Sequence, residues 1–69
     1  MSKRQKYRDV AKFLRSQGWE LRRQTGSHEI WGPIEGGQSF PVVQHKGEVS
    51  VGVVRQLQGI FPNTPDSWK

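Results

Sequence analysis

The chain has 69 residues and a mass of 7.9 kDa, which is enough for one domain and leaves no room for a second core. It has no cysteine, so disulfides and thiolate metal sites are excluded, and two histidines with six scattered acids make a poor metal site. No stretch approaches the ~18 consecutive apolar residues of a membrane span or resembles a signal peptide. We therefore expect a soluble, cytoplasmic protein without a metal, cofactor or membrane contact, which gains additional stability from a partner protein.

The positive charge is concentrated at the N-terminal end. The formal net charge is +5 and the pI is about 10.3. Such an asymmetry suits a polyanion, most simply nucleic acid, although a solubilising surface is an equally good explanation of charge alone. Eight cations lie in the first third of the chain: Lys3, Arg4, Lys6, Arg8, Lys12, Arg15, Arg22 and Arg23.

The first predicted element is a helix. Apolar residues from Tyr7 to Leu14 recur at i, i+3, i+4 and i+7, and Gly18 is a suitable C-terminal stop. Alternation of apolar and polar residues over Trp19–Gln24 predicts a half-buried strand. Gly26 provides a turn before a second strand over 28–31.

A third strand is expected at Gln38–Val43, placed at an edge or interrupted at Pro41, which cannot donate a ladder hydrogen bond. Residues 44–49 are interpreted as a loop. Ser50 is the predicted N-cap of a second helix, which the Gly59–Pro62 segment ends.

These elements predict an α+β fold of order α-β-β-β-α, with two helices on one face of a three-stranded antiparallel sheet. We expect a single domain over residues 1–69, with its core at about 6–61 and an irregular tail at 62–69. Trp68 in that tail either docks back on the domain or contacts a partner.

Three stretches together resemble the HicA family, also called YcfA-like, of bacterial toxin–antitoxin toxins. They are FLRSQGWELRRQTGSH (13–28) followed by Ile30-Trp31, then FPVVQHKGE (40–48), and VGVVRQLQGI (51–60). The resemblance implies a fold similar to a double-stranded-RNA-binding domain, an endoribonuclease activity that cleaves mRNA, and a HicB-type antitoxin that covers the active surface. The family's functional histidine maps onto His28.

An imidazole suits RNA cleavage because it can exchange a proton near neutral pH while the RNA supplies its own nucleophile, the 2′-hydroxyl. We expect His28 to act on the 2′-oxygen or on the leaving 5′-oxygen, without a metal, and to leave a 2′,3′-cyclic phosphate. Gly26 and Ser27 shape the turn and support catalysis, although Ser27 is equally well explained as a plain turn serine. His45 is a candidate second acid or base, and Glu29 a weaker one.

Cations and aromatic residues complete the predicted site. Arg22, Arg23 and Lys46 are candidates for holding the reacting phosphate. Ile30 and Trp31 must point to opposite faces of a strand, and an outward Trp31 would suit the antitoxin interface. Further RNA-binding candidates are Arg55, Lys3, Arg4 and Lys6.

Two alternatives to a nuclease remain open at this point. If His28 is only a strand-end histidine that bonds to backbone, the chain is a non-catalytic RNA-binding module of similar fold. If the basic face binds protein instead of RNA, the chain is an adaptor.

Overall fold

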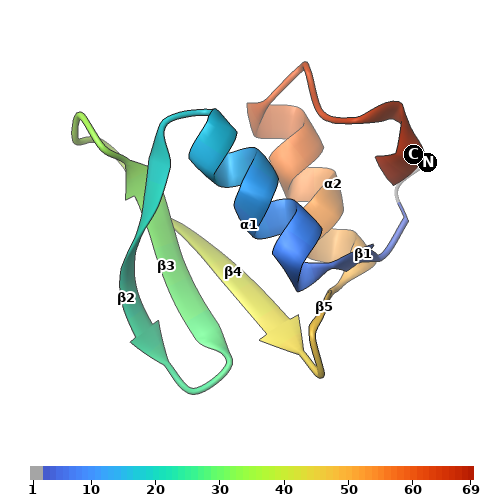
Figure 1. Ribbon diagram of the computed structural model, residues 1–69, viewed down its shortest axis with the longest axis horizontal. Helices are drawn as coiled ribbons and strands as arrows, with labels where there is room; N and C mark the ends of the chain where they lie inside the picture. Colours follow the sequence, from blue (N-terminus) through green and yellow to red (C-terminus); the bar gives the residue numbers. More distant parts are fainter. Residues whose placement is uncertain (1–2) are drawn as a thin grey trace.

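A computed structural model describes residues 3–69, so Met1 and Ser2 lie outside the described residues. Five strands in this part of the chain form one antiparallel sheet in the order β1-β5-β4-β3-β2, which confirms the α+β class (Figure 1). The elements of residues 3–69 are β1 (Gln5–Lys6), α1 (Tyr7–Ser16), β2 (Trp19–Thr25), β3 (His28–Pro33), β4 (Phe40–His45), β5 (Glu48–Val49), α2 (Val51–Ile60) and the 3-10 helix η1 (Asp66–Trp68).

Helix α1 and the β2–β3 hairpin form where the sequence predicts them. The prediction that β2 is half-buried was wrong, because only Trp19 is partly buried and Leu21 is 38% exposed. The apolar stripe of α1 is buried at Val10, Ala11 and Leu14, and Gly18 leaves the helix with a φ of 81°. Gly26 turns the hairpin with a φ of 60°, a left-handed conformation that costs glycine little because it has no Cβ.

The prediction of three strands was wrong, because β1 and β5 extend the sheet to five strands within residues 3–69. The segment 44–49, expected to be a loop, contains the tight hairpin that joins β4 to β5. Lys46 and Gly47 both have positive φ, 53° and 78°, and such two-residue turns match the twist of antiparallel strands. His45 is therefore the last residue of β4 rather than a loop residue.

Pro41 lies in β4, which has β3 on one side and β5 on the other. It pairs with Ile30 of β3, whereas β5 pairs with β4 only at Gln44 and His45. At Pro41 the strand has a partner along one side only, so the missing N–H breaks no second ladder.

Helix α2 begins as predicted, with the side chain of Ser50 accepting a hydrogen bond from the Val53 N–H. It runs through Gly59 to Ile60 and ends within the predicted Gly59–Pro62 segment, with Phe61 as its C-cap. The tail then returns to the domain, where Trp68 is 2% exposed. Its ring packs edge-on against Phe13 at a centroid distance of 5.1 Å.

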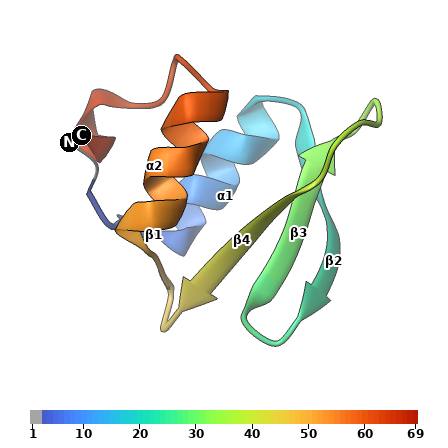
Figure 2. The ribbon, with the colours of Figure 1, turned by 180° about the vertical axis from the view of Figure 1, so that it is seen from behind.

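The helices pack on one face of the sheet, and α1 and α2 lie side by side in both views (Figures 1 and 2). Side chains from both helices and from β3, β4 and β5 share a single apolar core. Among the described residues no helix covers the opposite face, which we call the open face. Its residues on β3 and β4 are exposed or half-buried: His28, Ile30, Pro41, Val43 and His45.

Candidate functional site

His28 is the first residue of β3 and lies on the open face. Alternation along β3 buries Glu29 and Trp31 under the helices and leaves His28 on the other side, exposed. Thr25 of β2 and Val43 of β4 are its direct neighbours across the sheet. No other residue in 3–69 hydrogen-bonds its imidazole, so a strand-end histidine held by backbone is not what this part of the chain shows. The ring is available to a ligand.

His45 lies on the same face, two residues beyond Val43 in β4. Diagonal neighbours on an antiparallel pair are typically about 7–8 Å apart between Cα atoms, so the two histidines lie at the same end of the open face. The ladder continues past His28, since the Gln44 N–H donates to the Ser27 carbonyl at 3.1 Å. The Gly26-Ser27 turn is thus beside His45, and the structure brings together all four residues that the sequence associates with catalysis.

Arg22 has a structural task that the sequence did not reveal. A β-bulge between Leu21 and Arg23 directs its guanidinium over Gly32, where an added Cβ would lie 2.6 Å from its Cζ. Its nitrogens donate to the Pro33 carbonyl at 2.6 Å, the Gly37 carbonyl at 3.0 Å and the Ser39 hydroxyl at 2.8 Å. Arg22 therefore clamps the β3–β4 loop.

The other predicted cations divide between the two sides of the molecule. Arg23 is exposed, pairs with Ile30 next to His28, and forms no hydrogen bond or ion pair with another of residues 3–69. At the far side of the open face, Lys6 of β1 lies opposite Glu48 of β5 in the sheet register, and Glu48 lies opposite His45 of β4. Arg4 forms an ion pair with Glu48 at 3.4 Å.

Arg55 and Lys3 are placed elsewhere. Arg55 is exposed on α2, in the layer that covers the opposite face of the sheet from His28. The backbone N–H of Lys3 donates to the carbonyl of Trp68 at 2.7 Å, which ties the N-terminal segment to the tail. The structure does not bring either residue beside His28.

The prediction that Trp31 contacts a partner was wrong, because Trp31 is fully buried. A carboxylate buried with it explains this orientation. Glu29 is 2% exposed and accepts from Tyr7 Oη at 2.5 Å, Trp31 Nε1 at 3.0 Å and Gln44 Nε2 at 3.3 Å. Glu29 is thus buried on the helix side with three donors, away from the open face, which removes it as a second acid or base there. The Glu29-x-Trp31 spacing places both residues on one face of a strand, and this was the sequence feature that could have indicated a shared buried side.

The buried Glu29 carboxylate also affects the pKa of Tyr7, which donates a hydrogen bond to it. Burial raises the pKa of Tyr7 to about 12, and the hydrogen bond and negative charge of Glu29 add to the effect. Gln44, between Val43 and His45, ties β4 to the same network. The strands that carry both histidines are therefore anchored to α1 from behind.

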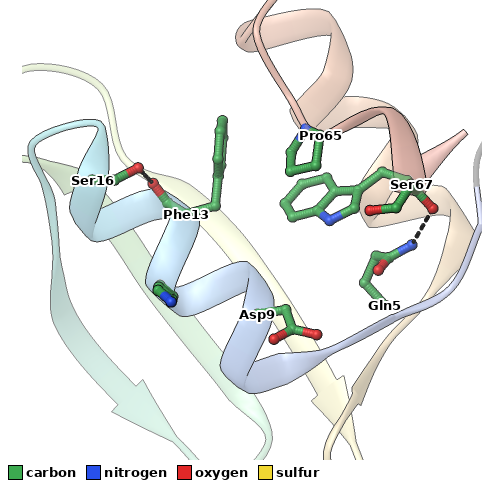
Figure 3. Close-up of a pocket in the computed structure, with 8 residues that line it drawn as sticks. Gln5, Asp9, Phe13, Ser16, Pro65 and Ser67 are labelled. Atoms are coloured by element: carbon green, nitrogen blue, oxygen red, sulfur yellow. Dashed lines mark hydrogen bonds between the residues drawn. The ribbon is translucent and has the colours of Figure 1, made fainter.

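A pocket of about 350 Å³ lies on the helix side of the sheet, between α1 and the tail (Figure 3). Asp9 and Phe13 of α1 border it on one side, and Pro65 and Ser67 on the other. It has neither histidine and lies across the sheet from the open face, so it takes no part in the chemistry considered for His28.

Neither a metal site nor a membrane helix is found in the described residues. No group of three His, Asp or Glu side chains within 3–69 could hold a metal ion. In the same range, both helices fall short of the length and apolar character that crossing a membrane requires.

Comparison with protein families gives a match over residues 7–59, from the start of α1 almost to the end of α2. The matching family is described as HicA toxin of bacterial toxin-antitoxin.

This chain belongs to the HicA toxin family.

No curated protein and no solved structure matches the chain. Membership confirms the resemblance drawn from the Gly-Ser-His segment and implies an antitoxin partner for this HicA-family toxin. The matched range contains His28 and His45 together with the network around Glu29.

Proposed function

We propose that this HicA-family toxin is an endoribonuclease that cleaves mRNA in the cytoplasm on its open face, with His28 as the proton-transfer group. The observation that supports this most directly is the exposed imidazole of His28 on a sheet face free of helices. Family membership gives that face its expected substrate. The order α1-β2-β3-β4-α2, with both helices on one face, supports the likeness to a double-stranded-RNA-binding domain.

The proposed reaction needs only groups of the RNA and the protein. The ribose 2′-oxygen attacks the adjacent phosphorus, the bond to the 5′-oxygen breaks, and a 2′,3′-cyclic phosphate remains. One imidazole removes the proton of the 2′-hydroxyl and another protonates the leaving 5′-oxygen, so that His28 and His45 would flank a single phosphate. Each such transfer contributes about 10²–10⁴-fold to the rate.

Charge must supply part of the remaining acceleration, because a phosphate gains negative charge as the new bond forms. Arg23 is the cation that supports this role best, since it is exposed on the strand next to His28. Its guanidinium can hold two phosphate oxygens at once. Arg22 is committed to the β3–β4 loop and would contribute mainly by keeping β2 and β3 in register.

The antitoxin, proposed to be HicB-type, would cover the same face. Between the histidines and Arg23 lie Ile30, Pro41 and Val43, an apolar strip bordered by cations. An apolar centre with a polar rim is typical of protein interfaces. Ile30 thus replaces Trp31 as the proposed contact residue of β3.

Expression in cells tests the proposal against its alternatives. The intact chain should arrest growth, and the His28→Ala variant, accumulated to the same level, should not. Equal arrest by both would contradict catalysis and favour an RNA-binding module that sequesters messages. An adaptor would show no affinity for RNA even at low salt, where phosphate contacts are strongest.

A further inference from the structure

A second pocket lies at the end of the open face that His45 occupies. It has a volume of about 240 Å³ and is lined by Arg4, His45, Lys46, Glu48 and Ser50. The β4–β5 turn builds its wall, and the Tyr7 N–H donates to the Gly47 carbonyl at 2.8 Å, which fixes that turn against α1. The pocket is therefore part of the folded sheet.

The charges in this pocket do not balance. Glu48 is its one carboxylate, and the Arg4 ion pair at 3.4 Å uses a single guanidinium nitrogen. Both side chains are more than half exposed, so the pair is weak and readily exchanged. Lys46 adds a second cation, and Lys6 lies across from Glu48 on β1. The surroundings of Glu48 are suited to a further anion.

We infer that this pocket, named the flanking pocket, holds one backbone phosphate of the RNA beside the phosphate that His28 attacks. The inference rests on the proposed function and gives its substrate a direction across the sheet. A strand of RNA that passes from Arg23 over His28 and His45 reaches Lys46 next, since β4 continues into the turn. Glu48 competes with that phosphate for Arg4, and its carboxylate takes the position of the ligand when RNA is absent.

Binding of a 2′-O-methyl RNA decamer tests the inference, because this oligomer retains every phosphate and lacks the attacking hydroxyl. Affinity is measured by fluorescence anisotropy over a range of salt. Each phosphate neutralised on a single strand contributes about 0.7 to the slope of log K against log salt. In the Arg4→Gln/Lys46→Gln double variant, affinity should depend less steeply on salt: the negative slope should become shallower by about 0.7, and binding should weaken about fivefold at 0.1 M salt.

The matched control is Arg8→Gln/Lys12→Gln, which removes the same charge from exposed positions of α1 on the helix side. It should keep the wild-type slope. Equal slopes for the two double variants would overturn the inference, as would an equal loss of affinity for the decamer in both.

Glu48→Gln gives a result of opposite sign. Removing the competing carboxylate should tighten binding of the decamer, whereas Glu35→Gln in the exposed β3–β4 loop should change it less. A Glu48→Gln variant that binds no tighter than Glu35→Gln would refute the competition. These tests measure binding alone, so a protein that shows these effects but leaves natural RNA uncut would refute the proposed cleavage and retain the flanking pocket.

Discussion

Replacing Glu29 tests whether the buried carboxylate holds the histidine-bearing strands in place. Glu29→Ala removes the acceptor of three side chains, of which the Trp31 ring is fully buried. An unsatisfied buried donor costs about 1–3 kcal/mol, and a hydrogen bond to a charged group is worth about 1.5–3 kcal/mol. Tyr7 and Gln44 are only partly buried and can recover bonds to water. We therefore expect a total loss of about 4 kcal/mol.

Glu29→Gln should cost much less. Tyr7 and Trp31 both donate to Oε1, which the amide retains, while Gln44 donates to Oε2 and can turn its own amide to accept. Only the charge is lost, at about 1 kcal/mol.

Urea unfolding followed by tryptophan fluorescence measures both losses, with Glu35→Ala as the exposed control. A chain of 69 residues has a free energy of unfolding of roughly 3–10 kcal/mol, so the alanine variant should unfold at a much lower urea concentration, and at the low end of this range it should be largely unfolded without urea. The control should stay within about 0.5 kcal/mol of the wild type. If Glu29→Ala costs no more than Glu29→Gln, the network does not stabilise the fold.

Three further predictions follow from single side chains. The unfolded chain ionises its tyrosine near pH 10, whereas folded Tyr7, with a pKa of about 12, keeps its proton. The free energy of unfolding should therefore fall as the pH rises through this range. Urea midpoints should show this fall in the wild type and a smaller fall in Tyr7→Phe. Arg22→Ala should speed hydrogen exchange in the β3–β4 loop without changing the salt dependence of RNA binding, whereas Arg23→Ala should lower that dependence and leave the loop intact. Trp68→Ala should lose about 3–5 kcal/mol of stability in urea, and a loss below 1 kcal/mol would show that the tail is not part of the core.

The longer elements were predictable because their patterns are local. The stripe of α1, the alternation of β2 and the glycine turn at Gly26 each depend on neighbouring residues. Strands β1 and β5 have two residues each and no period of their own. Strand β1 pairs with β5 across more than forty positions of the chain, at Gln5 with Val49 and Lys6 with Glu48, which no local pattern reports. Strand β5 also pairs with β4 across the two-residue Lys46-Gly47 turn, at Gln44 with Val49 and His45 with Glu48.

His28 was predictable as a candidate, because a short motif named the residue; the structure then places it on the open face. Alternation separated Ile30 from Trp31 without saying which points inward. Trp31 is buried together with Glu29, which accepts its indole N–H. Sequence reasoning did not predict this, because a charged residue is rarely found in a core. The clamp of Arg22 depends on a bulge and on loop carbonyls, and sequence patterning shows neither.

Proton transfer by His28 is tested most directly by single-turnover cleavage of an RNA by the purified chain and by His28→Gln, with the 3′ ends of the products identified. If His28 transfers the proton, the wild type forms 2′,3′-cyclic phosphate ends, the folded variant is slower by at least about 10², and a 2′-deoxy nucleotide at the scissile position abolishes cleavage there. Cleavage at the wild-type rate by His28→Gln, or at a 2′-deoxy position, would contradict this mechanism.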